Sequence, residues 1–184
     1  MISKRLACCF DCPKVLFGQQ LFFPDKNNNG VYLFQSIMTG QSLNDNLWHT
    51  IKFSRRASHF NLQLDQDPPA RAEKDMGQGN LLEYKELIVG GYPPSSPAGD
   101  NRTPGFSGVM QHFRWNGVPY LELARTASHS PRSLPHFTVT GKFSRREHPL
   151  THHAVTFRSK HTFLGLPALK AYSTTNIFFQ VGSF

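Results

Sequence analysis

Apolar and polar residues alternate with a period of two along the middle of the chain, and this pattern predicts β-strands rather than helices. The clearest run is "HFNLQLD", in which Phe60, Leu62 and Leu64 would face one side and the polar residues the other. The preceding strand, opened by Trp48, would pair with this run across the turn "RRAS". The two runs therefore predict an antiparallel hairpin.

More short strands follow in the same style. "ELIVGG" reads as a buried strand closed by two glycines, and "FSGVMQHFRW" as a strand that ends in Asn116-Gly117, a dipeptide typical of two-residue hairpin turns. "VPYLEL" would then return as the partner strand. About six such strands at short spacing indicate a two-sheet sandwich. The large side chains expected in its core are Trp48, Phe53, Phe60, Leu62, Leu64, Ile88, Phe106, Met110 and Phe113.

Composition supports an all-β domain. The chain has 184 residues, with 16 Phe, 14 Gly and 13 Pro. The aromatic residues supply volume for a core, and the abundant Gly and Pro favour turns over long helices.

Positive charge is concentrated in one part of the chain. The formal net charge is +8, and residues 125–161 hold seven Lys or Arg against a single acid, Glu147. This segment is interpreted as a solvated linker or, alternatively, as a site for polyanions such as sulfated glycosaminoglycans. Nucleic acid is not expected, because basic and aromatic residues do not interleave on a recognisable module. The polyanion alternative rests on Arg132, Lys142, Arg145, Arg146, Arg158 and Lys160.

Cysteines and leader signals exclude some classes of protein. Cys8, Cys9 and Cys12 are clustered with no later partner, so neither an internal disulfide framework nor a zinc site is expected. The apolar run near the start is shorter than a secretory signal needs. The chain is therefore expected to contain neither a signal peptide nor a membrane span.

Catalytic chemistry is not expected either. His49 has no nucleophile or carboxylate partner in the sequence pattern, so it is predicted to point outward or to bond a neighbouring loop. A glycosidase would need two convergent carboxylates, and only Asp65 and Glu122 lie near strand ends. Ser58 is assigned to the hairpin turn rather than to phosphorylation. Asn101, in "NRT", is a glycosylation sequon if the chain is secreted.

Four motifs in order resemble a laminin G domain, also called an LNS domain. They are "WHTIKFSR", "LQLD", "LIVGG" and "FSGVMQHFRWNG". The resemblance implies an antiparallel jelly-roll sandwich that recognises extracellular or cell-surface proteins without catalysis. It covers residues 31–124, the C-terminal part of one such domain, and leaves residues 1–30 unassigned.

A second match lies further on. Residues 154–184 resemble the opening strands of another LNS domain, after a basic linker at 125–153. The order resembles that at the junction of the fourth and fifth LNS domains in the α-neurexin family. The chain is therefore expected to be part of a larger protein on the extracellular side of the plasma membrane, with the tail either free or filling a vacant position in the sheet of the first domain.

Calcium is a further implication of the resemblance. Some LNS domains bind one calcium at the rim, and Glu83 would offer its backbone carbonyl here. Lys85 stands where a coordinating Asn can sit. A lysine ammonium cannot ligate a hard cation, so Lys85 counts against the calcium site that the resemblance implies.

Overall fold

The fold is seen in a computed structural model, which describes residues 6–7, 15–24, 30–40, 43, 45–73, 82–84, 87–91, 106–129, 137–143, 154–159, 161–167 and 169–182. All strand pairings in it are antiparallel.

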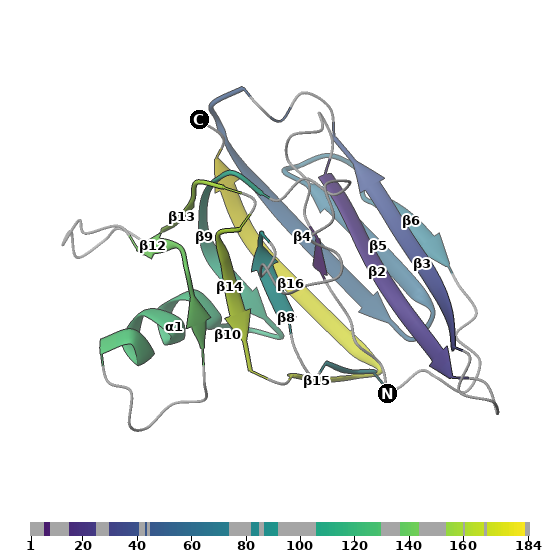
Figure 1. Cartoon of the computed structure of the whole chain (residues 1–184). Helices are drawn as coiled ribbons and strands as arrows, with labels where there is room; N and C mark the ends of the chain where they lie inside the picture. Colours follow the sequence, from purple (N-terminus) through teal and green to yellow (C-terminus); the bar gives the residue numbers. More distant parts are fainter. Residues whose placement is uncertain are drawn as a thin grey trace.

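One large sheet dominates the fold (Figure 1). Its strands run in the spatial order β12, β13, β9, β16, β4, β5, β6, and β10 pairs with β9. Their bounds are β12 Lys142–Phe143, β13 Val155–Phe157, β9 Gly108–Trp115, β16 Thr174–Gly182, β4 Trp48–Arg56, β5 His59–Leu64, β6 Ala70–Glu73 and β10 Val118–Pro119.

Three smaller sheets complete the sandwich. They are β1-β2-β3, β11-β14-β8 and β15-β7. Their bounds are β1 Leu6–Ala7, β2 Val15–Pro24, β3 Gly30–Thr39, β7 Leu82–Tyr84, β8 Leu87–Gly90, β11 Thr138–Val139, β14 Phe163–Leu166 and β15 Leu169–Tyr172. Side chains of these sheets, including Ile37, Val89 and Leu164, share one buried cluster with those of the large sheet. The predicted antiparallel two-layer architecture is thus confirmed.

The predicted core is correct except at one residue. Phe53, Phe60, Leu62, Leu64, Ile88, Phe106, Met110 and Phe113 are all buried. Trp48, however, is 49% exposed, so its assignment to the core is wrong. Ile51, Phe53 and Arg55 face the core from β4, and because side chains alternate along a strand, Trp48 points to the opposite face.

A bulge in β9 shifts the strand by one residue, so that Met110 and Phe113 both face the core. Met110 and Phe113 are both fully buried although they are three positions apart, a spacing that a regular strand would place on opposite faces. The register between β16 and β9 shifts at this point, and His112 has a φ of 58°. The extra residue thus returns Phe113 to the core side.

At the end of β9 the predicted hairpin turn is confirmed, whereas the predicted return strand is mostly replaced by a helix. Asn116 and Gly117 have φ values of 47° and 83°, as the predicted hairpin turn requires. The expected return strand "VPYLEL" is only two residues long, and helix α1, Tyr120–His129, begins directly after Pro119. Leu121 and Ala124, three positions apart, are fully buried and dock this helix.

The tail of the chain lies inside the large sheet. β16 pairs with β4 along nine residues and with β9 on its other side. The yellow strand in the middle of Figure 1 is this segment. Residues 174–182 therefore fill a central sheet position beside strands of the 31–124 region, and the idea that they open a second domain in a longer protein stays a prediction.

Candidate recognition site

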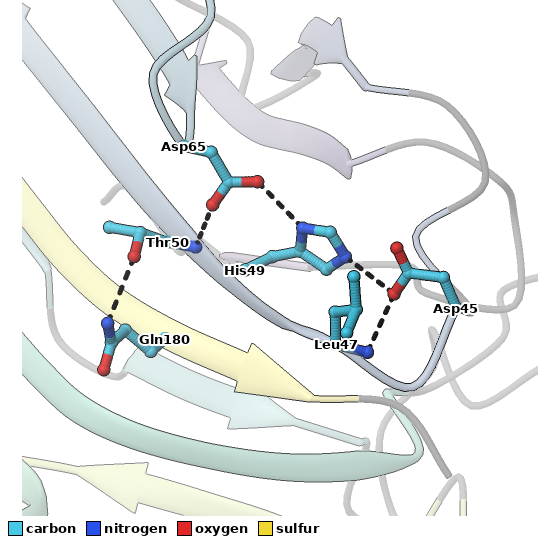
Figure 2. A network of polar contacts seen from close by, with 6 residues as sticks. All are labelled: Asp45, Leu47, His49, Thr50, Asp65 and Gln180. Atoms are coloured by element: carbon cyan, nitrogen blue, oxygen red, sulfur yellow. Dashed lines mark hydrogen bonds and ion pairs between the residues drawn. The ribbon is translucent and has the colours of Figure 1, made fainter.

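The start of β4 is fixed by a polar cluster around His49 (Figure 2). Nδ1 of His49 lies 2.8 Å from Oδ2 of Asp65, and Nε2 lies 3.0 Å from Oδ1 of Asp45. Asp65 follows β5 in the hairpin, and Asp45 precedes β4. The imidazole thus joins two loops, which confirms the second of the two expectations for His49, but its two carboxylate partners were not recognised in the sequence.

Both carboxylates have additional backbone partners. The N–H of Thr50 donates to Oδ1 of Asp65 at 2.7 Å, and the N–H of Leu47 donates to Oδ1 of Asp45 at 2.9 Å. The second bond, made two residues along the chain, is the kind by which an Asp side chain closes a tight turn. The loop at 45–47 is therefore tied both to itself and to β4.

The electrostatics of the cluster favour a charged imidazole. An ionised carboxylate only accepts hydrogen bonds, so a ring with both nitrogens protonated satisfies Asp65 and Asp45 together. Burial of the ring lowers the pKa of His49, but the hydrogen bonds and negative charges of Asp65 and Asp45 outweigh it, and the pKa is raised. The backbone bond from Leu47 is the main reason that the pKa of Asp45 is lowered.

Two large apolar side chains project from this braced loop. Leu47 is 62% exposed and Trp48 is 49% exposed, although both precede His49, whose side chain is only 11% exposed, by one or two positions. Trp48 lies opposite Gly182 of β16, at the end of the large sheet. Leu47 and Trp48 together are called the rim pair below. Exposed neighbouring apolar groups on a fixed backbone are typical of contact surfaces.

Asp65 could have been found as the partner of His49 from the sequence. In the predicted hairpin across "RRAS", Ile51 faces Leu64, so the next position outward sets Thr50 opposite Asp65. The burial of Arg55, a residue of the laminin G motif, was not predicted: it is only 1% exposed and donates from Nη1 to the carbonyl of Ala57 at 3.2 Å. The sequence pattern did indicate this burial, because Arg55 belongs to the same period-two series as the buried Ile51 and Phe53.

The structure describes two of the six residues proposed for polyanions. Lys142 lies on the edge strand β12, and Arg158 follows β13 two residues after Thr156, the partner of Lys142. Both side chains are exposed. Arg132, Arg145, Arg146 and Lys160 lie outside the described residues.

The other predicted sites are only partly described. Glu83 lies in β7 opposite Lys170, and Asn101 and Lys85 fall outside the described residues. Within the described ranges, no three or more His, Cys, Asp or Glu side chains converge as a metal site. Because Lys85 is not among the described residues, the calcium site with the backbone carbonyl of Glu83 stays a prediction.

The two carboxylates considered for catalysis have separate places. Asp65 is bonded to His49 and Thr50, whereas Glu122 lies in the first turn of α1 rather than at a strand end. The two carboxylates thus lie on different elements, one directly after β5 and one in α1. In the part of the chain that the structure describes, no helix is long and apolar enough to cross a membrane.

Comparison with known proteins agrees with this architecture. A family model for the laminin G domain matches residues 21–118. The chain is 38% identical over 154 residues to Neurexin 1 of Drosophila melanogaster, covering 79% of the chain and 8% of that protein. It is 30% identical over 155 residues to Neurexin-3a of Danio rerio, again 79% of the chain and 8% of the relative.

The chain spans only about a twelfth of the length of these relatives, and no solved structure matches it. The family match begins before residue 31 and takes in β3, the β4-β5 hairpin and the buried part of β9. With its antiparallel sandwich and this match over more than half of its residues, the chain belongs to the laminin G domain family.

Proposed function

We propose that this chain is a non-enzymatic, extracellular recognition module of a neurexin-like surface protein, and that it binds a partner protein. Membership of the laminin G family and similarity to two neurexins support the adhesion class. The larger protein would display the module on the outer side of the plasma membrane. In that setting Asn101 would be a glycosylation acceptor.

The observation that carries the proposal is the rim pair on its braced loop. Leu47 and Trp48 expose most or half of their surface, yet the loop is fixed by the contacts of Asp45 with Leu47 and His49. A fixed backbone reduces the entropy lost on binding, and a tryptophan supplies a large apolar contact. The complementary partner surface would contain an apolar pocket.

The test uses the full chain, multimerised and fluorescently labelled, on intact neuronal cells. We expect Leu47→Ala/Trp48→Ala to reduce cell binding at least tenfold and Arg56→Gln, a change on the same sheet face, to leave it within twofold. Prior proteolysis of the cell surface should abolish binding, and enzymatic removal of sulfated chains should not. Binding that survives the double substitution would refute a role for the rim pair.

The second candidate function is polyanion binding by the basic segment. The exposed cations Lys142 and Arg158 support it, since the β12-β13 pairing brings them near one another at the sheet edge. In this case binding to immobilised heparin should weaken steeply as salt rises, because exposed charges are screened. Lys142→Gln/Arg158→Gln should lower the salt concentration of elution. A protein interface bridged by calcium would respond to a chelator instead.

A further inference from the structure

A groove lies on the outer face of the large sheet, and its lining does not include Leu47, Trp48, Lys142 or Arg158. Its volume is about 610 Å³, within the range of roughly 300–1,000 Å³ typical of ligand sites. It is lined by Lys52, Phe53, Ser54, Asn61, Gln63, Pro69, Arg71, Arg114, Gly117, Asn176, Ile177 and Phe178. These described lining residues include three cations and no carboxylate.

Strand register arranges the lining side chains in two rows. Residues that face each other across neighbouring strands project to the same side of a sheet. The first row runs through Arg114, Phe178, Lys52 and Gln63 on β9, β16, β4 and β5. The second runs through Asn176, Ser54, Asn61 and Arg71 on β16, β4, β5 and β6. The floor is thus a built array of cations and amides around one aromatic ring.

Two residues outside the strands of the floor complete the lining of the groove. Gly117 belongs to the hairpin turn after β9, and Pro69 precedes β6. The N–H of Asn176 donates to Oδ1 of Asn116 at 2.7 Å, and the N–H of Asn116 donates to the carbonyl of Asn176 at the same distance. The turn after β9 is therefore held to β16 by two hydrogen bonds.

We propose that this groove binds an acidic oligosaccharide, with carboxylate or sulfate groups on Lys52, Arg114 and Arg71 and a sugar ring against Phe178. Lys52 and Arg114 lie on the two strands that flank β16, so their backbones are two strand spacings, or roughly 10 Å, apart. An oligosaccharide with repeated charges can contact both cations and also the ring of Phe178, which lies between them in the register. Asn61 and Asn176 supply amide groups for its hydroxyls.

A peptide fits this face less well. Peptides add to sheets by pairing their backbone with a free strand edge. The groove floor lies on β16, β4 and β5, which are paired on both sides, so their backbone groups are already used. A ligand here must be held by side chains alone, and spaced cations, amides and an aromatic ring match a charged sugar.

The test measures binding of the full chain to heparin-derived and hyaluronan-derived hexasaccharides by calorimetry. We expect at least one of them to bind, and Lys52→Gln/Arg114→Gln to weaken its affinity at least tenfold. Phe178→Leu, which keeps an apolar residue in β16, should weaken it about threefold to tenfold. The sulfated or the carboxylated sugar, whichever binds more tightly, identifies the preferred anion.

Two controls make the outcome decisive. Lys142→Gln/Arg158→Gln removes equal charge from the basic segment and should change the affinity less than twofold, as should Leu47→Ala/Trp48→Ala in the rim pair. Unchanged melting temperatures for the groove variants would show that they fold, since Lys52 and Arg114 are both exposed. The proposal is overturned if neither sugar binds, if the groove variants bind normally, or if polyglutamate binds as tightly through the same residues.

Discussion

Nδ1 of His49 lies 2.8 Å from Oδ2 of Asp65, so the start of β4 is joined to the turn after β5 by a contact between two titratable groups. The side chain of His49 is 11% exposed and that of Asp65 is 40% exposed. Because the charge of His49 depends on pH, the strength of the contacts that hold the start of β4 also depends on pH.

The pH dependence of stability follows from the sign of the pKa shift. Because the folded-state pKa of His49 is raised, its contribution is fully present below its unfolded value of about 6.5 and is lost as pH rises through the folded-state value. We therefore expect the melting-temperature difference between wild type and His49→Gln to be largest between about pH 5 and 6.5 and to shrink by pH 8.5. A difference that stays constant over this range would show that the ring acts only by packing.

Burial of the two faces of the hairpin predicts unequal costs of truncation. Leu62→Ala should reduce the free energy of unfolding by about 2–5 kcal/mol, because Leu62 is fully buried in the core. Trp48→Ala removes a larger side chain but should cost less than about 1 kcal/mol, since Trp48 is half exposed. Urea denaturation of both variants measures the difference. A larger loss for Trp48→Ala would place the tryptophan in the core after all.

Two glycines with positive φ predict different responses to an added methyl group. Gly117 has a φ of 83° and open space around its Cβ position, so Gly117→Ala should cost only the backbone strain of about 1–2 kcal/mol. Gly90 has a φ of 98°, and a Cβ there would clash with the ring of Phe157. Gly90→Ala should therefore destabilise the fold clearly more, as measured by thermal unfolding. Equal costs would contradict the packing of β8 on Phe157.

The central position of β16 predicts strong protection of its backbone. Since β16 pairs with both β4 and β9, amides such as that of Val181 should exchange as slowly as those of β4. Removal of residues 174–184 would leave both neighbours with unpaired edges and should abolish cooperative unfolding. Addition of a peptide of residues 169–184 should restore it. Hydrogen exchange and calorimetry make the test, and a shortened chain that still melts sharply would contradict the pairing.

Local features were the most predictable part of the fold. The hairpin from Trp48 to Leu64 and the turn at Asn116 follow from alternation and turn chemistry, which depend on a few neighbouring residues. The sequence also contained the information that Trp48 faces away from the core, because its position is even whereas those of the buried Ile51 and Phe53 are odd. The helix from Tyr120 was missed because a short apolar run suits either a strand or a helix.

Features that depend on tertiary contacts were beyond sequence reasoning. The bulge at His112 exists because both Met110 and Phe113 are buried, and no propensity marks the extra residue in advance. The groove likewise joins residues of β9, β16, β4, β5 and β6. Only the sheet order brings Arg114 and Lys52 to either side of Phe178.

The pairing of Thr50 with Gln180 also has a consequence for how the protein is made. Their side chains are hydrogen-bonded at 3.1 Å although 130 positions separate them. A contact so distant along the chain requires a long loop to close, and such topologies fold slowly. During synthesis β4 and β9 emerge from the ribosome well before the strand that separates them. The nascent chain must therefore wait with two open strand edges, and chaperones that shield such edges should be needed until β16 has been translated.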